Sequence, residues 1–275
     1  MEMRSFPQYG HYLQIEPGLE LYYEDKGEGD PLLLIPGITM TGEVFARQFE
    51  HFSKKRRVVT LDPRSQGRSS KVLHGNNYAQ HGRDLDALIR ALDLKNICLA
   101  GWSTGNFDVW SYIDQFGLSR VKQVVTIDMS PMPLSQEPSD WVEMPYDALP
   151  TVLLDLLASA KGQRDFFAGY ARETMLEHPS DEDVAKIVDL TCMSPVHILH
   201  TLLTNVLFCD YRSTVKKIEE SVPALMFIAK HWSDVAEPYM KRHFPKTRTV
   251  VMGGHMMFYE YAAEWNQALE EFLKG

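Results

Sequence analysis

The stretch of sequence that decides the fold is NICLAGWSTG, residues 96–105. An apolar run typical of a buried strand ends in Gly101-Trp102-Ser103-Thr104-Gly105, and the segment 106–116 has the apolar spacing of a helix. A Gly-x-Ser-x-Gly sequence between a strand and a helix is a nucleophile elbow, in which small residues let strand and helix pack closely around a strained serine. We therefore expect Ser103 to be a nucleophile.

Working outward from the elbow, short apolar runs alternate with amphipathic helical segments. This alternation predicts an α/β fold in which a mostly parallel central sheet carries helices on both faces. An antiparallel hairpin is expected before it, because a Pro17-Gly18 turn separates two strand-like runs. The hairpin strands are expected at 11–16 and 19–25, and the remaining strands at 31–35, 58–61, 96–100, 121–127, 222–228 and 247–252.

Residues 133–212 contain helical patterns and no convincing strand. They predict a helical cap inserted into the α/β core, which would consist of residues 1–132 and 213–275. The helices are expected at 146–160, 163–177, 181–191 and 196–206, with a loop following the strand at 222–228 and a closing helix at 261–273.

Composition excludes several classes of protein. The 275 residues carry a net charge of −9, and the basic run 54–57 stands alone, so a nucleic-acid partner is not expected. Residues 1–6 lack the layout of a signal peptide, and no apolar stretch approaches the length of a membrane span. Three cysteines at unrelated spacings predict free thiols and no metal site. We expect a cytoplasmic protein that can form a homodimer, with a small-molecule substrate, no cofactor and no membrane partner.

A serine nucleophile needs a base, and the base needs an acid. His255 is the candidate base, because it follows the last strand on a Gly253-Gly254 turn and so reaches the sheet edge that carries Ser103. Two aspartates preserve the chain order of serine, acid and histidine. Asp234, expected in the loop after the strand at 222–228, is preferred, and Asp128, at the end of the preceding strand, is the alternative.

The oxyanion of an acyl-transfer reaction needs backbone donors. The candidates are the N–H groups of Thr104, directly after the nucleophile, and of Ile38, in the loop after the strand at 31–35. Large apolar side chains next to these positions predict an apolar substrate pocket. Its candidate lining residues are Trp102, Met40, Met129 and Met256.

With these pieces placed, the whole chain resembles the α/β-hydrolase superfamily, and in particular its esterase and haloperoxidase-like members. The resemblance is carried by Ile35-Pro36-Gly37-Ile38, by the turn 62–69 (DPRSQGRS), by the elbow, and by Gly254-His255. The chain departs from the usual pattern at Ser65 and Asn106, where glycine is common.

The resemblance implies a serine hydrolase of small, largely apolar esters or lactones that works through an acyl-enzyme. One alternative is a cofactor-free dioxygenase that opens 3-hydroxy-4-quinolone rings, whose members place their acid where this chain has Asp128. Those enzymes carry histidines where this chain has Met40 and Thr104. The third alternative is a small-molecule receptor without catalytic activity.

Overall fold

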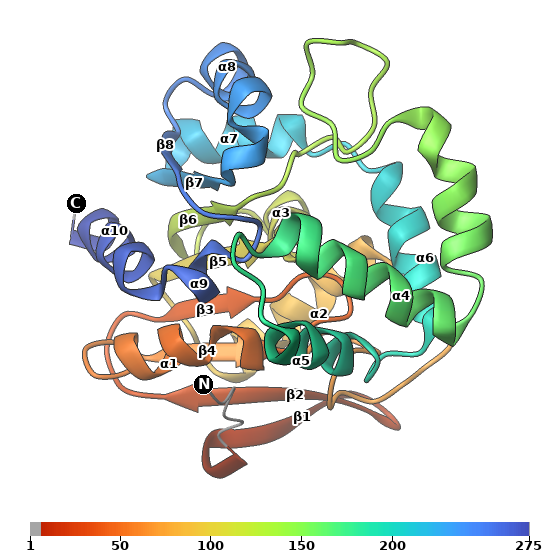
Figure 1. Cartoon of the computed structure of the whole chain (residues 1–275). Helices are drawn as coiled ribbons and strands as arrows, with labels where there is room; N and C mark the ends of the chain where they lie inside the picture. The colour runs from red at the N-terminus through yellow and green to blue at the C-terminus, as the bar shows by residue number, and fades with distance from the viewer. Residues whose placement is uncertain (1–6, 275) are drawn as a thin grey trace.

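The computed structural model describes residues 7–274, apart from the side chains of residues 7, 155 and 156. The N-terminal hexapeptide, on which the signal-peptide expectation depends, lies outside the described residues. Within this described part of the chain, eight strands form one twisted sheet with helices packed on both of its faces (Figure 1).

The sheet has the strand order β1-β2-β4-β3-β5-β6-β7-β8. The hairpin strands β1 and β2 are antiparallel to each other, β2 is antiparallel to β4, and all later pairs are parallel. This confirms the predicted hairpin and mostly parallel sheet. The strands are β1 (Gly10–Glu16), β2 (Leu19–Lys26), β3 (Leu32–Ile35), β4 (Val58–Leu61), β5 (Ile97–Trp102), β6 (Val121–Ile127), β7 (Ala224–Ile228) and β8 (Arg248–Val251).

Alternating residues of the buried strands face two hydrophobic clusters, one on each side of the sheet. Leu34 and Ala100 face the cluster that includes α1 (Ala46–Phe52) and α10 (Ala262–Lys274). Leu33 and Leu99 face the opposite cluster, which includes helices α2, α3, α7 and α8. A strand buried on both faces must be apolar throughout, which is why these strands are continuous apolar runs. Their bounds are α2 (Tyr78–Ala91), α3 (Gly105–Phe116), α7 (Arg212–Ser221) and α8 (Ser233–His243).

The segment between β6 and β7 contains a series of helices between residues 146 and 207, close to the expected positions. Two of its elements are π-helices, at Thr151–Leu156 and Ala171–Met175. The α-helices are α4 (Ala160–Tyr170), α5 (Asp181–Thr191) and α6 (Val196–Leu207), which lie together at the front and right of Figure 1. No single helix in the described part of the chain has the length and apolarity of a membrane span, although α5 and α6 together do, bent by 87° at their junction.

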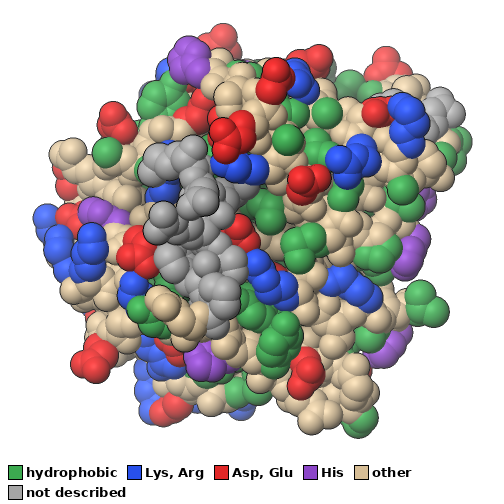
Figure 2. Space-filling model, turned by 60° about the horizontal axis from the view of Figure 1, so that its bottom comes forward, with side chains coloured by type: hydrophobic (Ala, Val, Ile, Leu, Met, Phe, Trp, Pro, Cys, Tyr) green, Lys and Arg blue, Asp and Glu red, His purple; other side chains and the backbone are tan. Residues whose placement is uncertain are grey.

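The expected loop after β7 is wrong, because α8 occupies most of it. Acidic and basic side chains are interspersed on the face shown in Figure 2. Within the basic run, Arg57 pairs with Asp25 at 2.5 Å and Lys55 with Glu270 at 3.1 Å. These charges therefore tie neighbouring elements of the core together.

Candidate active site

Ser103 lies where β5 turns into α3, with a φ of 52° that only a tight, over-determined turn imposes on a non-glycine residue. The flanking glycines are required by close packing. A Cβ on Gly101 would lie 2.7 Å from the Asn106 backbone, and one on Gly105 would lie 2.4 Å from the Pro36 carbonyl oxygen. Asn106, which departs from the usual glycine, donates from Nδ2 to the Ser103 carbonyl at 2.9 Å and so braces the strained turn.

His255 and Asp128 form a buried hydrogen-bonded pair. The His255 Nδ1 atom lies 2.6 Å from the Asp128 Oδ2 atom, and both side chains are almost completely inaccessible to solvent. The other carboxylate oxygen of Asp128 accepts from the Ala229 N–H at 2.7 Å. The opposite ring nitrogen, His255 Nε2, is buried and has no hydrogen-bond partner among the described residues. That nitrogen is therefore not occupied by a donor from this part of the chain and is free to accept a proton.

The backbone of His255 is also fixed. Its N–H donates to the Thr174 carbonyl at 3.0 Å, and its carbonyl accepts from Trp102 Nε1 at 2.8 Å. The first bond connects the histidine to the helical segment between β6 and β7, and the second connects it to the residue before Ser103. These two bonds therefore fix the positions of the strand before Ser103, the loop that carries His255 and the helical segment relative to one another.

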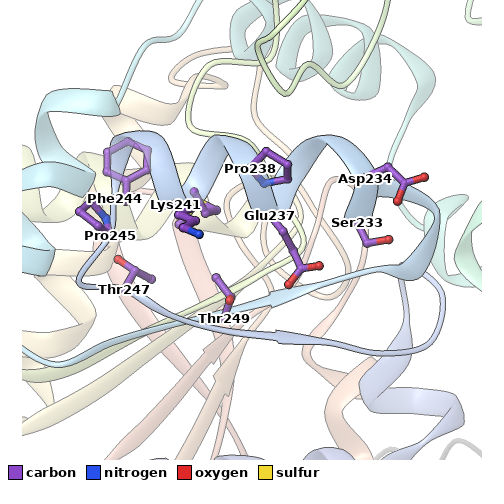
Figure 3. Close-up of a pocket in the computed structure, with 10 residues that line it drawn as sticks. Ser233, Asp234, Glu237, Pro238, Lys241, Phe244, Pro245, Thr247 and Thr249 are labelled. Carbon is purple, nitrogen blue, oxygen red and sulfur yellow. The ribbon is translucent and has the colours of Figure 1, made fainter.

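Asp234, the preferred acid in the sequence analysis, does not contact His255. It is exposed in the first turn of α8, at the end of a groove between α8 and β8, with Ser233 and Glu237 on the same side of the helix (Figure 3). The preference was wrong because the residues after β7 form a helix that directs this carboxyl away from the sheet edge. Asp128, the alternative, is brought to the histidine by the end of β6, which adjoins β5.

The two expected oxyanion donors lie beside the cavity that Ser103 lines. Ile38 and Thr104 both line a cavity that also contains Ser103. Within the described residues, neither backbone N–H donates a hydrogen bond to the protein. Free amides at a nucleophile are what an oxyanion site requires.

The turn 62–69 supports the loop that carries Ile38. The Gln66 side-chain oxygen accepts from the Thr39 N–H, and Asp62 Oδ1 accepts from the Gly42 N–H at 2.8 Å. Thr39 has a φ of 58° and is fully buried. The second motif of the resemblance therefore fixes the conformation of the oxyanion loop. Ser65 adopts a φ of 62°, so it holds the left-handed conformation that glycine usually supplies there.

The cavity beside Ser103 has a volume of about 120 Å³ and mainly apolar walls. Of the four predicted lining residues, Met129 lines it. Trp102, Met40 and Met256 do not line it; they are at most 1% exposed and pack in the hydrophobic core instead.

Most of the wall comes from residues that the sequence analysis did not single out. They lie on α4, on α6 and in the segment that follows β6, and they are Pro133, Glu143, Met144, Phe166, Phe167, Tyr170, Leu199, Leu203, Val206 and Leu207. Their helical spacing identified amphipathic helices but could not tell a cavity wall from a core contact. Burial raises the pKa of the Glu143 carboxyl to about 8; the nearby Asp128 charge adds to the effect and the Ser130 N–H opposes it.

Comparison with known proteins now places the chain in a family. The model of the alpha/beta hydrolase fold matches residues 30–173, and the chain belongs to the α/β-hydrolase family. It is 36% identical over 116 residues to "Putative non-heme chloroperoxidase" of Synechocystis sp., covering 42% of this chain and 41% of the relative. It is 28% identical over 137 residues to a non-heme haloperoxidase of Rhodococcus erythropolis, covering 50% of each. The chain thus spans half or less of the length of these curated relatives.

Solved structures share nearly the whole fold. A bromoperoxidase from Bacillus anthracis has a TM-score of 0.84 and 25% identity, covering 97% of this chain and all of that one (100%). An esterase from Exiguobacterium antarcticum has a TM-score of 0.82 and 22% identity, with coverages of 97% and 100%. The enol-lactonase from Burkholderia xenovorans has a TM-score of 0.78 and 19% identity, with coverages of 96% and 100%.

Proposed function

We propose that the protein is a serine hydrolase that cleaves carboxylic esters or lactones through an acyl-enzyme. The observation that carries this proposal is the combination of a strained elbow serine and a buried His255–Asp128 pair whose free nitrogen, Nε2, has no protein partner. The apolar cavity beside Ser103 supports small, largely apolar substrates.

In the proposed reaction, Ser103 Oγ attacks the carbonyl carbon while His255 Nε2 accepts the hydroxyl proton. Asp128 holds Nδ1–H and stabilises the imidazolium that forms. The Ile38 and Thr104 N–H groups donate to the negatively charged oxygen, and each such donor contributes about 3–4 kcal/mol to transition-state stabilisation in comparable enzymes. His255 then gives its proton to the leaving alcohol. A water molecule, deprotonated by the same histidine, attacks the acyl-enzyme, releases the carboxylic acid and restores Ser103.

The test is covalent labelling of the full chain with a fluorophosphonate, followed by mapping of the adduct by mass spectrometry. We expect one adduct on Ser103 that is lost in Ser103→Ala and strongly slowed in His255→Ala. The matched control is His231→Ala, because His231 is an exposed histidine near the same loops and forms no hydrogen bond with Asp128. Absence of labelling in the folded wild-type protein, or labelling that is indifferent to His255, would refute an activated serine.

Labelling also separates the alternatives. A ring-opening dioxygenase would consume oxygen with a 3-hydroxy-4-quinolone and survive Ser103→Ala; the relatives named above are hydrolases and haloperoxidases, which does not favour that activity. A receptor would bind a ligand tightly and leave Ser103 unlabelled.

The names of the haloperoxidase relatives favour one second candidate activity. Hydrogen peroxide in place of water would attack the acyl-enzyme and release a peroxy acid, with its O–O bond intact, which then oxidises halide in solution. The test is bromide oxidation in the presence of acetate and hydrogen peroxide. It should require Ser103, and its persistence in Ser103→Ala would exclude this route.

A further inference from the structure

The cavity that contains Ser103 carries one acidic side chain that the proposed mechanism does not use. Glu143 lines the cavity together with apolar residues such as Met144 and Phe166. A carboxyl in an apolar wall is costly unless its oxygens are bonded, because transfer of a polar group from water without a partner is unfavourable. Its presence here calls for a ligand or a structural role.

The segment that carries Glu143 is held rigidly. The Glu143 N–H donates to the Pro133 carbonyl at 3.0 Å, and the Ser130 hydroxyl donates to the Trp141 carbonyl at 2.6 Å. Trp141 is fully buried. These bonds close the loop between residues 130 and 143, so the carboxyl is placed at the cavity by the fold and not by a freely moving surface loop.

Only half of the carboxyl is used by the protein. Glu143 Oε1 accepts from the Ser130 N–H at 2.9 Å. Across the described residues, the Glu143 carboxyl forms no other hydrogen bond and no ion pair with lysine, arginine or histidine. Any structural role of the carboxyl therefore uses Oε1 alone, and Oε2 remains available to bind a ligand.

The titratable groups that face Glu143 do not neutralise it. Asp128 acts on it from the end of β6, and the Tyr170 phenol from α4 lies close enough to respond to its charge. Both are acidic groups, and His255 is already paired with Asp128. Burial raises the pKa of the Glu143 carboxyl to about 8, so that at neutral pH it is mainly protonated and can donate a hydrogen bond.

We propose that Glu143 is a specificity-determining residue that binds an oxygen atom on the acyl part of the substrate, through Oε2, while Ser103 holds the carbonyl carbon. We assign this oxygen atom to the acyl part because the acyl part stays bonded to Ser103 after the alcohol has left. It therefore occupies the cavity that both residues line. The substrate class is thus an ester or lactone whose acyl chain is apolar apart from an ether, carbonyl or hydroxyl oxygen. This inference rests on the proposed serine hydrolase activity.

The test compares isosteric esters. In 4-nitrophenyl pentanoate one methylene is replaced by oxygen to give 4-nitrophenyl 3-methoxypropanoate or 4-nitrophenyl ethoxyacetate, which accept but cannot donate a hydrogen bond. The measured quantity is the ratio of kcat/KM for each ether ester to that for pentanoate. Differences in intrinsic reactivity cancel when this ratio is compared between variants.

At pH 7 we expect Glu143→Leu to lower the ratio at least about tenfold for one of the ether esters, because one hydrogen bond to the substrate is lost. Glu143→Gln should keep the ratio within about threefold, since its amide also donates. The matched control, Met144→Leu, changes an apolar neighbour and should alter all three rates in parallel.

The wild-type protein provides a test without substitution. Its ratio should fall as the pH rises from 7 to 9, because ionisation of Glu143 removes the donated proton, whereas the Glu143→Gln ratio should stay constant. A wild-type ratio that does not change with pH and matches that of Glu143→Leu would overturn the inference. Hydrolysis of all three esters with no such discrimination refutes the role of Glu143 alone, and failure to hydrolyse any of them refutes the proposed function.

Discussion

Replacing Asp128 by asparagine changes one atom of the side chain but reverses what it offers to His255. In the native protein the carboxylate accepts twice, from the Ala229 N–H at 2.7 Å and from His255 Nδ1 at 2.6 Å. An amide has one oxygen, and the Ala229 N–H requires that oxygen. The amide NH₂ then faces Nδ1, which must accept the bond and so lose its proton.

The displaced proton moves to Nε2, the nitrogen that the proposed mechanism needs as a base. The fold is preserved but the tautomer is wrong, and the imidazolium has lost its counter-charge. We expect kcat to fall by roughly 10³–10⁴-fold, which corresponds to about 4–5.5 kcal/mol of transition-state stabilisation.

The assay is steady-state hydrolysis of 4-nitrophenyl pentanoate, with circular dichroism to confirm folding. Asp234→Asn is the matched control, because Asp234 is exposed on α8 and should leave kcat within about twofold of wild type, as surface substitutions usually do. The reasoning fails if Asp128→Asn keeps more than about a tenth of the wild-type kcat, or if Asp234→Asn loses as much activity as Asp128→Asn.

Three further expectations concern stability and positioning. Because the pKa of Glu143 rises from 4.5 to about 8 on folding, the free energy of unfolding of the wild-type protein should fall as the pH rises through that interval. Glu143→Gln lacks this loss and should be more stable than the wild type above pH 8, by at most about 5 kcal/mol in urea titrations. The same pH dependence of the unfolding free energy in both proteins would contradict this expectation. Gln66→Ala removes the acceptor of the buried Thr39 N–H and should lower kcat about tenfold with little change in KM; an unchanged kcat would show that the oxyanion loop holds its own conformation. Gly101→Ala places a methyl group 2.7 Å from the Asn106 backbone and should lower the free energy of unfolding by about 1–3 kcal/mol or more, measured by thermal unfolding, and an unchanged Tm would contradict the packing argument.

The sheet and the elbow could be predicted because their signals are local. Buried parallel strands are apolar runs, and the Gly-x-Ser-x-Gly spacing states a packing requirement in five residues. The position of His255 followed from the same logic, since the carboxyl ends of parallel strands meet at one edge.

The partner of His255 could not be predicted by that logic, because both aspartates follow a strand of the same sheet. The choice depended on whether residues 233–243 form a helix, and Pro238 within this segment weakened its helical signal. The cavity wall was missed for a different reason. Glu143 lies outside any periodic element, and its approach to Ser130 depends on a loop closure that only the assembled fold shows.

Because Asp128 directly follows β6, the strand beside the serine strand, the unit formed by β7 and α8 supplies no reacting group in the proposed mechanism. The unit covers the sheet, and Ala229, which follows β7, donates its N–H to Asp128. The proposed mechanism therefore places no constraint on the residue types on the outward face of α8. It is also a suitable position at which to attach a dye, a surface anchor or a second protein without disturbing turnover.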